Sequence, residues 1–256
     1  MGMSPRLEFA IGAAFRAGRS TLPLFETGTP VEHKGDDSPI TAADRGSERI
    51  LRAEIERHFP GEAILGEEQG LSGAGDDRWI VDPLDGTKSF IAGVPLYSTL
   101  VAYERAGTPI LGVAYFPAIE TMVYAESGGG AFWNGRPMQV RSVTRLEGEA
   151  IACGGHRSLI ARNRWEGFAA LIGLAMTTRT WGDAYGHVLV ASGRIAAMVD
   201  PIVSRWDISA IIPIIQEAGG SATDFAGGDP LIGESNLELI SCAPGVREEL
   251  LATFRS

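Results

Sequence analysis

Short apolar runs separated by glycine, proline and charged residues fill positions 63 to 133 of the 256-residue chain, and this pattern limits the fold most strongly. The runs read AILG, RWIVD, STLVAYE, ILGVAYF, TMVYAES and GAFWN. Such spacing predicts a largely antiparallel sheet with hairpins. Two helices are expected before it: one over residues 5 to 25, and one that starts near Thr41, where Thr41 and Asp44 resemble an N-terminal cap pair.

Beyond about residue 147 the pattern changes to strands that alternate with helices. Strands are expected at AIACGG, TTRTW, AAMVD and ELISC, and helices over residues 158 to 173, 184 to 192, 207 to 218 and from 245 onward. This alternation predicts helices that cover a mixed sheet. The chain is therefore expected to join an N-terminal α+β half, residues 1–147, to a C-terminal α/β half, residues 148–256, in one compact unit.

The composition limits the partners of such a fold. The net charge is −10 and no cluster of Lys and Arg offers a surface for phosphate backbones, so a nucleic-acid partner is not expected. Cys153 and Cys242 lie in separate apolar stretches, which fits free thiols in a reducing cytoplasm. Charged residues interrupt the apolar positions of residues 1 to 18, so neither a signal peptide nor a membrane span is expected. These features favour a cytoplasmic protein that binds small ligands or metal ions.

Three acidic positions lie where a predicted strand passes into a loop or helix. They are Glu67 with Glu68, Asp82 with Asp85, and Asp207. Carboxylates that converge from separate loops suit Mg²⁺, which needs hard oxygen ligands at about 2.1 Å and often shares a substrate phosphate. Taken one at a time, other roles remain open: Asp207 as a helix cap, Glu67 and Glu68 as solvated loop residues, and Asp82 as a turn former.

The phrase DPLDGT, residues 82 to 87, favours the metal interpretation. Its glycine and threonine are expected to start a short helix, whose N–H groups would meet a phosphate beside the metal site. The phrase also differs from the Asp-x-Asp-Gly-Thr of phosphatases that form an aspartyl-phosphate, since both Pro83 and Leu84 intervene here. Attack by metal-activated water is therefore favoured over a covalent intermediate.

Four motifs in order resemble the inositol monophosphatase family of magnesium-dependent, lithium-sensitive phosphatases. They are KGDDSPITAAD (34 to 44), GEE (66 to 68), DPLDGT (82 to 87), and WDISA (206 to 210) followed by EAGG (217 to 220). The match covers nearly the whole chain. The resemblance implies a layered αβαβα sandwich, a homodimer, and two or three Mg²⁺ ions per active site, held between the halves.

The resemblance also implies roles for individual residues. The implied metal ligands are Glu67, Asp82, Asp85, Asp207 and the backbone carbonyl of Leu84. Thr87, together with Glu67 and Asp44, is expected to position the attacking water. The N–H groups of Gly86 and Thr87 are expected to hold phosphate oxygens. Lys34 matches a family lysine near the site, with a surface role left open.

Substrate choice is expected to depend on positions that differ from the inositol enzymes. Asp200 stands where those enzymes carry a glutamate, and Gly182-Asp183 replaces a Gly-Ser or Gly-Thr. The phrases GDAYGHVLVASGR and MVDPIVSRWD resemble the bacterial histidinol-phosphate phosphatases of the family. Asp183 and Asp200 would pair with the ammonium and imidazole groups of histidinol phosphate, which inositol lacks. A helix cap at Asp183 and a turn at Asp200 remain the alternatives.

Arg205 and the histidines are the remaining candidates. Arg205 takes a place where relatives often have proline, and it is a candidate for the pocket entrance. The spacing of the four histidines, His33, His58, His156 and His187, gives no sign of a zinc site. His187 is expected to be packed or solvated.

The sequence thus predicts a Mg²⁺-dependent phosphomonoesterase that hydrolyses L-histidinol phosphate to L-histidinol and phosphate in histidine biosynthesis. One alternative keeps the chemistry but takes inositol 1-phosphate, or a broad set of sugar and nucleotide phosphates. The other is a catalytically silent relative that binds metal or a phosphorylated ligand as a regulator. The silent relative is disfavoured because the acidic residues and Thr87 are all present.

Overall fold

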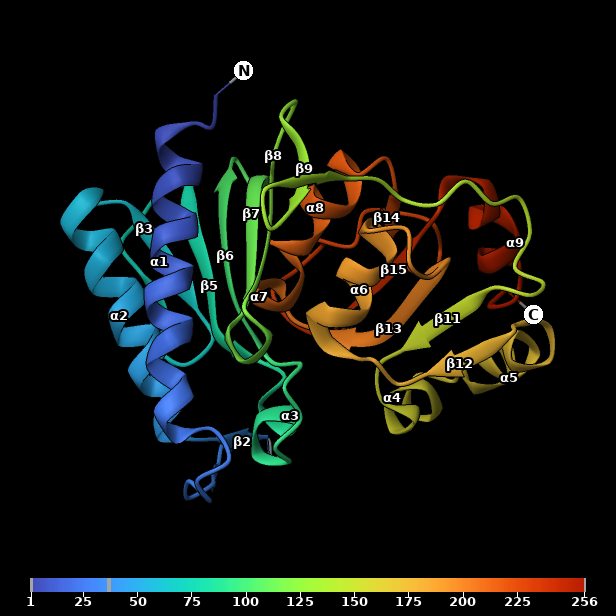
Figure 1. Cartoon of the computed structure of the whole chain (residues 1–256), viewed down its shortest axis with the longest axis horizontal. Helices are drawn as coiled ribbons and strands as arrows, with labels where there is room; N and C mark the ends of the chain where they lie inside the picture. The colour runs from blue at the N-terminus through green and yellow to red at the C-terminus, as the bar shows by residue number, and fades with distance from the viewer. Residues whose placement is uncertain (1, 36–37, 256) are drawn as a thin grey trace.

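The protein is described by a computed structural model that covers residues 2–35 and 38–255. These residues form sheets of eight, five and two strands, and the two larger sheets alternate with layers of helices (Figure 1). The smallest sheet pairs β1 (Glu32–His33) with β2 (Pro39–Ile40). None of the described helices has the length and apolar character needed to cross a bilayer.

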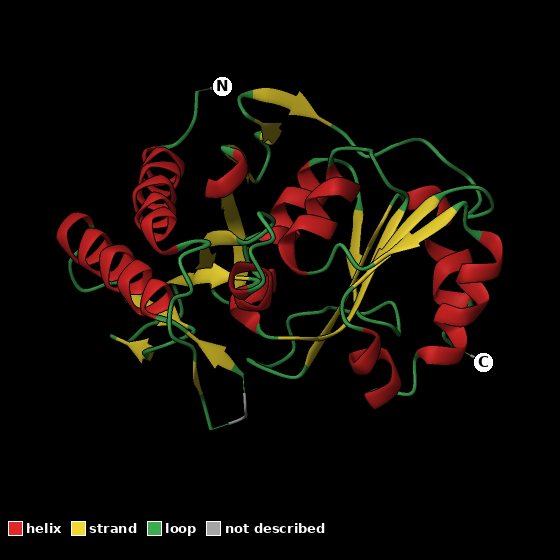
Figure 2. Ribbon diagram, turned by 60° about the horizontal axis from the view of Figure 1, so that its bottom comes forward, coloured by secondary structure: helices red, strands yellow, loops and turns green. Residues whose placement is uncertain are grey.

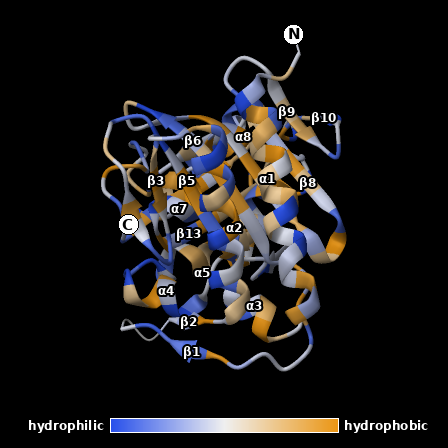
Figure 3. Cartoon of the chain, turned by 90° about the vertical axis from the view of Figure 1, so that its left-hand side faces the viewer, coloured by the Kyte–Doolittle hydropathy of each residue, from blue (hydrophilic) through white to orange (hydrophobic). Residues whose placement is uncertain are grey.

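Two capped helices open the chain. In α1 (Pro5–Thr21), the Ser4 hydroxyl accepts a hydrogen bond from the Leu7 N–H, and a 3₁₀ turn (Leu22–Leu24) ends the helix before the predicted residue 25. The α2 helix (Ala42–His58) begins with the predicted capping box of Thr41 and Asp44. Figure 3 shows hydrophilic and hydrophobic colours mixed along both helices, as expected for elements with one face on a sheet and one in solvent.

The eight-stranded sheet follows, and it confirms the predicted run of hairpins. All neighbouring strands are antiparallel except β3 and β5, which are parallel. In spatial order the strands are β10 (Arg136–Met138), β9 (Gly130–Trp133), β8 (Thr121–Glu126), β7 (Thr108–Phe116), β6 (Ser98–Arg105), β5 (Arg78–Asp85), β3 (Ala63–Gly66) and β4 (Gly70–Ser72). The short helix α3 (Thr87–Ile91) follows β5 directly, and a 3₁₀ turn (Pro117–Ile119) joins β7 to β8.

The five-stranded sheet lies in the second part of the chain. Its β11 strand is parallel to β12 and β13, whereas β15 runs antiparallel to β13 and β14. In spatial order the strands are β12 (Thr177–Arg179), β11 (Ala150–Cys153), β13 (Ala197–Val203), β15 (Leu237–Cys242) and β14 (Ser221–Thr223). The mixed sheet was predicted, but β14 was not. The boundary between the halves near residue 147 stays a prediction.

The helices of this part differ from the prediction at two places. The helix predicted over residues 158 to 173 is two helices, because Asn163 takes a left-handed conformation with φ of 55° between them. The helix predicted over 207 to 218 is also divided, into α7 and α8. The bounds are α4 (His156–Ala161), α5 (Trp165–Leu174), α6 (Asp183–Ala191), α7 (Arg205–Ile208), α8 (Ile211–Glu217), the 3₁₀ turn Pro244–Val246 and α9 (Arg247–Ala252).

These elements stack in five layers, which confirms the αβαβα sandwich. Helices α1 and α2 pack on the outer face of the eight-stranded sheet, and α6 and α8 lie between the two sheets. Helices α4, α5 and α9 cover the far face of the five-stranded sheet. Figure 2 shows this second sheet between the central helices and the helical layer near the C-terminus.

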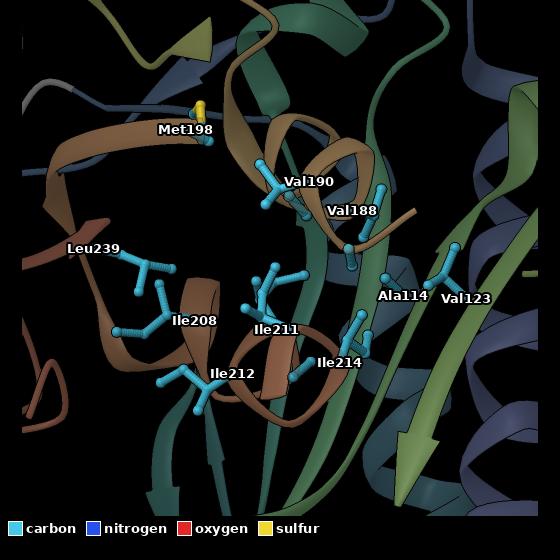
Figure 4. Close-up of a cluster of buried hydrophobic side chains, with 14 of the residues drawn as sticks. Ala114, Val123, Val188, Val190, Met198, Ile208, Ile211, Ile212, Ile214 and Leu239 are labelled. Carbon is cyan, nitrogen blue, oxygen red and sulfur yellow. The ribbon is translucent and has the colours of Figure 1, made fainter. Parts of the chain in front are cut away.

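The central layer holds the largest hydrophobic core. Ile208, Ile211 and Ile214 of the α7–α8 region pack with Val188 and Val190 of α6, between strands of both sheets (Figure 4). The contact with β7 is so close that a Cβ atom at Gly112 would lie 1.9 Å from the carbonyl oxygen of Ala210. Only glycine therefore fits at position 112, and the backbone of α7–α8 is fixed against the first sheet.

Candidate active site

The end of β5 carries the first two acidic residues of the site. The pairing of β5 with β6 is irregular between Asp82 and Asp85, and such bulges re-aim side chains at the end of a strand. Both carboxylates are buried. One oxygen of Asp82 accepts the Leu84 N–H at 3.0 Å. The Oδ2 atom of Asp85 accepts the Ser98 hydroxyl and the Ala184 N–H, each at 3.0 Å, so Asp85 ties β5 to α6.

Asp207 joins these residues from the other half of the chain. Its Oδ2 accepts the Ser204 N–H at 2.6 Å in a capping box, so the capping role left open by the sequence is real. The cap does not exclude a ligand role, because each of Asp82, Asp85 and Asp207 offers an oxygen, and these three atoms lie within 4.8 Å of one another. Segments more than 100 residues apart in sequence therefore meet at one point.

Burial and mutual repulsion disfavour the ionised form of these carboxylates when no cation is bound. Burial, followed by the charges of Glu67 and Asp85, raises the pKa of Asp82 well above its usual value. The pKa of Asp85 is raised in the same direction by burial and by Asp183 and Asp207. Burial and Glu67 raise the pKa of Asp207 to about 7. The donor set consists of hard oxygens that need a counter-charge, and this fits Mg²⁺.

Glu67 lies beside this group and is held by Lys34. The Lys34 ammonium is 2.8 Å from Glu67 Oε1 and 2.7 Å from Glu68 Oε1, so Lys34 lies at the site and not on a remote surface. Burial alone would lower the pKa of Lys34, but the two carboxylates outweigh it and raise the pKa. Burial raises the pKa of Glu68 to about 7 even though Lys34 acts against the rise. Glu67 and Asp82 line the same hollow of about 200 Å³.

Thr87, which also lines this hollow, forms a hydrogen-bonded pair with Asp44. The Thr87 hydroxyl donates to Asp44 Oδ1 at 3.0 Å and lies 3.2 Å from the Leu84 carbonyl oxygen. The other oxygen of the buried Asp44 accepts both the N–H and the hydroxyl of Thr41, at 2.7 and 2.6 Å. This arrangement fixes the Thr87 side chain. Thr87 is also the first residue of α3, with Gly86 as its N-cap, as the sequence predicted.

A second hollow of about 210 Å³ adjoins the first and shares Asp85, Lys88, Asp183 and Asp207 with it. Asp183, at the start of α6, takes φ of 58°, a left-handed conformation that is uncommon for a residue other than glycine. Its carboxylate approaches the DPLDGT loop so closely that a Cβ atom at Gly86 would lie 2.9 Å from Asp183 Oδ2. Asp183 is therefore not a mere surface cap.

Asp200 of β13 forms another part of this second hollow. Its carboxylate is buried, and a Cβ atom at Gly154 would lie 2.5 Å from Asp200 Oδ1. Burial, followed by the charges of Asp183 and Asp207, raises the pKa of Asp200 well above its usual value. Burial also raises the pKa of Asp183, and Lys88 opposes that rise. The structure thus brings both predicted substrate residues to one hollow beside the metal-ligand candidates.

Arg205 is placed differently from the sequence prediction. Its guanidinium is buried, pairs with Glu104 at 2.8 Å, and donates to the carbonyl oxygens of Leu231, Gly233 and Gly107. With these donors engaged, Arg205 does not line either hollow and is not available to a substrate there. Arg205 anchors α7, and with it Asp207, to β6.

Lys88 and His187 were not among the predicted site residues. Lys88 lines both hollows and directly follows DPLDGT, so its place immediately after that motif was an available signal. His187 lines the second hollow, whereas the sequence indicated only a packed or solvated residue. Asp36 and Asp37 of the KGDDSPITAAD motif lie outside the described residues.

The layered fold and the buried cluster of oxygen ligands fit a metal-dependent enzyme. The family model described as "Inositol monophosphatase family" matches residues 3–256. The chain belongs to the inositol monophosphatase family, whose members are metal-dependent phosphatases that usually use Mg²⁺.

Relatives named for different activities resemble the chain over most of its length. It is 41% identical to a histidinol-phosphatase of Chlorobaculum parvum, over 95% of both chains. It is 36% identical to an inositol-1-monophosphatase of Mesorhizobium japonicum, over 91% of this chain and 90% of that protein. The solved inositol monophosphatase of Anabaena superposes with a TM-score of 0.86 at 26% identity, over 98% of this chain and 95% of the other.

Proposed function

We propose that this phosphatase hydrolyses L-histidinol phosphate to L-histidinol and phosphate, with Mg²⁺ as its cofactor. The observation that carries the proposal is the second hollow, where the carboxylates of Asp183 and Asp200 lie next to the candidate metal ligands. A substrate whose alcohol part carries positive charge would compensate these two groups. Histidinol phosphate carries an ammonium and a titratable imidazole. The histidinol-phosphatase of Chlorobaculum parvum, at 41% identity, supports the same substrate.

In this proposal the first hollow binds metal and phosphate. Asp82, Asp85 and Asp207, with Glu67 and the Leu84 carbonyl, would hold the ions. A bound divalent cation would balance the excess of carboxylates in this hollow and would make water more acidic. The N–H groups of Gly86 and Thr87, at the start of α3, would bind phosphate oxygens, because the first N–H groups of a helix have no partner within it.

The attacking water would be oriented by Thr87 and Glu67. The Thr87 hydroxyl donates its hydrogen bond to Asp44, so its lone pairs remain to accept a hydrogen bond from the water molecule. Glu67 would take one proton from the water, and the other hydrogen stays on the water oxygen. The water oxygen then forms a bond to phosphorus, the P–O bond to the alcohol breaks, and the leaving oxygen takes up the proton that the water released, to give histidinol and phosphate.

An inositol phosphatase is the second candidate, because the Mesorhizobium japonicum relative is 36% identical. A phosphate-release assay with L-histidinol phosphate, inositol 1-phosphate, a sugar phosphate and a nucleotide monophosphate separates the two. We expect kcat/KM to be at least about tenfold higher for histidinol phosphate, which corresponds to about 1.4 kcal/mol of transition-state binding. Comparable turnover of inositol phosphate with little turnover of histidinol phosphate rejects the proposal.

The silent-regulator alternative is tested by the same assay. A protein that only binds metal or phosphorylated ligands would release no phosphate from any of the four esters.

Rescue of a histidine auxotroph that lacks its own phosphatase would separate the physiological reaction from hydrolysis of a substrate that is accepted only in the assay. Absence of rescue, together with hydrolysis of all esters at similar rates, favours the broad-specificity alternative.

A further inference from the structure

His187 is a buried polar residue with no role in the mechanism above. It lies on α6, only 2% exposed, and it contributes to the wall of the second hollow. Its Nδ1 atom is 2.7 Å from the hydroxyl oxygen of the buried Ser241 on β15. Its Nε2 atom has no hydrogen-bond partner among the described residues. Buried side-chain nitrogens are nearly always hydrogen-bonded, so this atom has a free hydrogen-bonding position for a ligand or a water molecule.

The ring does not serve as a counter-charge for the neighbouring carboxylates. Burial lowers the pKa of His187 to about 3, so the ring is neutral under ordinary conditions. A neutral imidazole with Nδ1 fixed on Ser241 offers at Nε2 either a lone pair or one N–H, according to the tautomer. Among the groups that line the second hollow, Lys88 carries the positive charge, against four carboxylates: Asp85, Asp183, Asp200 and Asp207.

These features together describe the ligand that the second hollow would accept. Metal ions would compensate Asp85 and Asp207, whereas Asp200 lies against Gly154 in the second hollow and Asp183 lines both hollows beside Gly86. A neutral polyol would hydrogen-bond to His187 but would leave buried negative charge without a partner, which costs free energy. A cationic alcohol that also carries a hydrogen-bonding ring nitrogen satisfies both requirements.

We propose that His187 is a specificity-determining residue whose Nε2 atom hydrogen-bonds a nitrogen of the leaving alcohol. In this arrangement Asp183 and Asp200 compensate the positive charge of the alcohol. This inference rests on the proposed function and adds to it the group that recognises the ring. Imidazole has one N–H and one lone pair, so it is a suitable partner for either tautomer of His187. The Ser241 hydroxyl holds the His187 ring in place through Nδ1, the nitrogen that would not contact the ligand.

Two substitutions separate recognition from simple packing. His187→Asn keeps a polar atom near the place of Nδ1 and loses the atom at Nε2, whereas His187→Gln reaches toward the place of Nε2. We expect His187→Asn to raise KM for histidinol phosphate, and the inhibition constant of L-histidinol, by about tenfold, the loss of one hydrogen bond of about 1.4 kcal/mol. His187→Gln should recover most of this loss. In His187→Asn, the kcat/KM for p-nitrophenyl phosphate, whose ring has no nitrogen, should fall by less than the kcat/KM for histidinol phosphate.

Exposed His58 on α2 supplies the matched control, and His58→Asn should change none of these constants. A wild-type comparison requires no variant: L-phenylalaninol has the ammonium group and a ring without nitrogen, so it should inhibit at least about tenfold more weakly than L-histidinol. Equal inhibition by the two alcohols, or equal losses on both esters in His187→Asn, would overturn the inference. If the wild-type enzyme turns over histidinol phosphate in these experiments, only the role of His187 is rejected; if it does not, the proposed function itself fails.

Discussion

Glu48 is fully buried, and its contacts show how a single residue can support the site without touching it. Its Oε1 accepts the Arg52 Nε–H at 2.7 Å and the Gln69 N–H at 3.1 Å, and its Oε2 accepts the Glu68 N–H at 2.7 Å. These bonds fix the turn that follows β3. Glu67 lies in this turn, so Glu48 determines where Glu67 points.

Replacement of Glu48 by Gln should destabilise the protein by roughly 3 kcal/mol, because it leaves Arg52 buried without its charge partner. Urea unfolding measures this loss. Glu54→Gln on the same helix is the control: its pair with Arg16, whose side chain is 48% exposed, should contribute less than about 1 kcal/mol. Equal effects of the two substitutions would show that Glu48 has no special structural role.

At the scale of elements, the position of Asp207 depends on how α7 and α8 pack against the first sheet. Arg205 pairs with Glu104 of β6 across 101 residues of sequence, and Ser209 donates to the same carboxylate. On the other side, Gly112 of β7 allows the backbone at Ala210 to come close. The metal-ligand candidates from the two halves are therefore held together by rigid elements and not by loops alone.

A methyl group at position 112 tests this close contact. Gly112→Ala should destabilise the protein by about 1–3 kcal/mol or more, because the added Cβ would lie 1.9 Å from the Ala210 oxygen and the elements must separate. Gly46→Ala on α2 meets no atom within 4 Å and should be neutral or stabilising by roughly 0.4–1 kcal/mol. Thermal or urea unfolding compares them. If Gly112→Ala were as stable as the wild type, the described contact between β7 and α8 would be wrong.

Local signals in the sequence were sufficient for some of these elements. The Thr41–Asp44 cap, the hairpin strands, and the start of α3 after DPLDGT depend on neighbouring residues, so they could be predicted. The predicted helix is divided at Asn163 because this residue takes a left-handed conformation. Asparagine occurs both inside and outside helices, so the sequence alone did not reveal the division. The contact between Arg205 and Glu104 arises only from tertiary packing, so the sequence did not predict it.

The site shows the same contrast. The acidic residues were predictable because each follows a strand or precedes a helix in a motif. That Asp207 both caps α7 and faces Asp82 could not be read from the sequence, since one carboxylate has an oxygen for each role. The free nitrogen of His187 was also hidden, because it depends on Ser241 of a distant strand.

For the whole molecule, the buried carboxylates make stability depend on pH when metal is removed. A carboxyl group whose pKa rises on folding binds its proton more tightly in the folded state, so its contribution is lost as pH rises from the unfolded value toward the folded value. For Asp207 this window extends from 3.8 to about 7, and Asp82, Asp85 and Asp200 act in the same direction because their pKa values are also raised. His187, whose pKa is lowered to about 3, acts in the opposite direction below 6.5.

With a chelator present, the melting temperature should therefore fall as pH rises from about 6.5 through 7, the upper part of the Asp207 window, where His187 no longer contributes. Each kcal/mol lost corresponds to roughly 2–4 °C for a chain of this size. Calorimetry in EDTA measures the fall, and the same scan with excess Mg²⁺ is the control. Mg²⁺ should remove most of the pH dependence, since bound ions stabilise the folded state and the ionised carboxylates. A metal-free protein that became more stable over this range would contradict the account.

The central claim is that carboxylates from both halves of the chain bind divalent ions, and titration calorimetry with Mg²⁺ tests it most directly. Asp85→Asn removes one charge and one ligand at the centre of the site, whereas Asp76→Asn removes a charge from an exposed position. The account predicts that Asp85→Asn weakens Mg²⁺ binding by at least about tenfold and abolishes hydrolysis, while Asp76→Asn changes neither. Undiminished Mg²⁺ binding and hydrolysis in Asp85→Asn would contradict it.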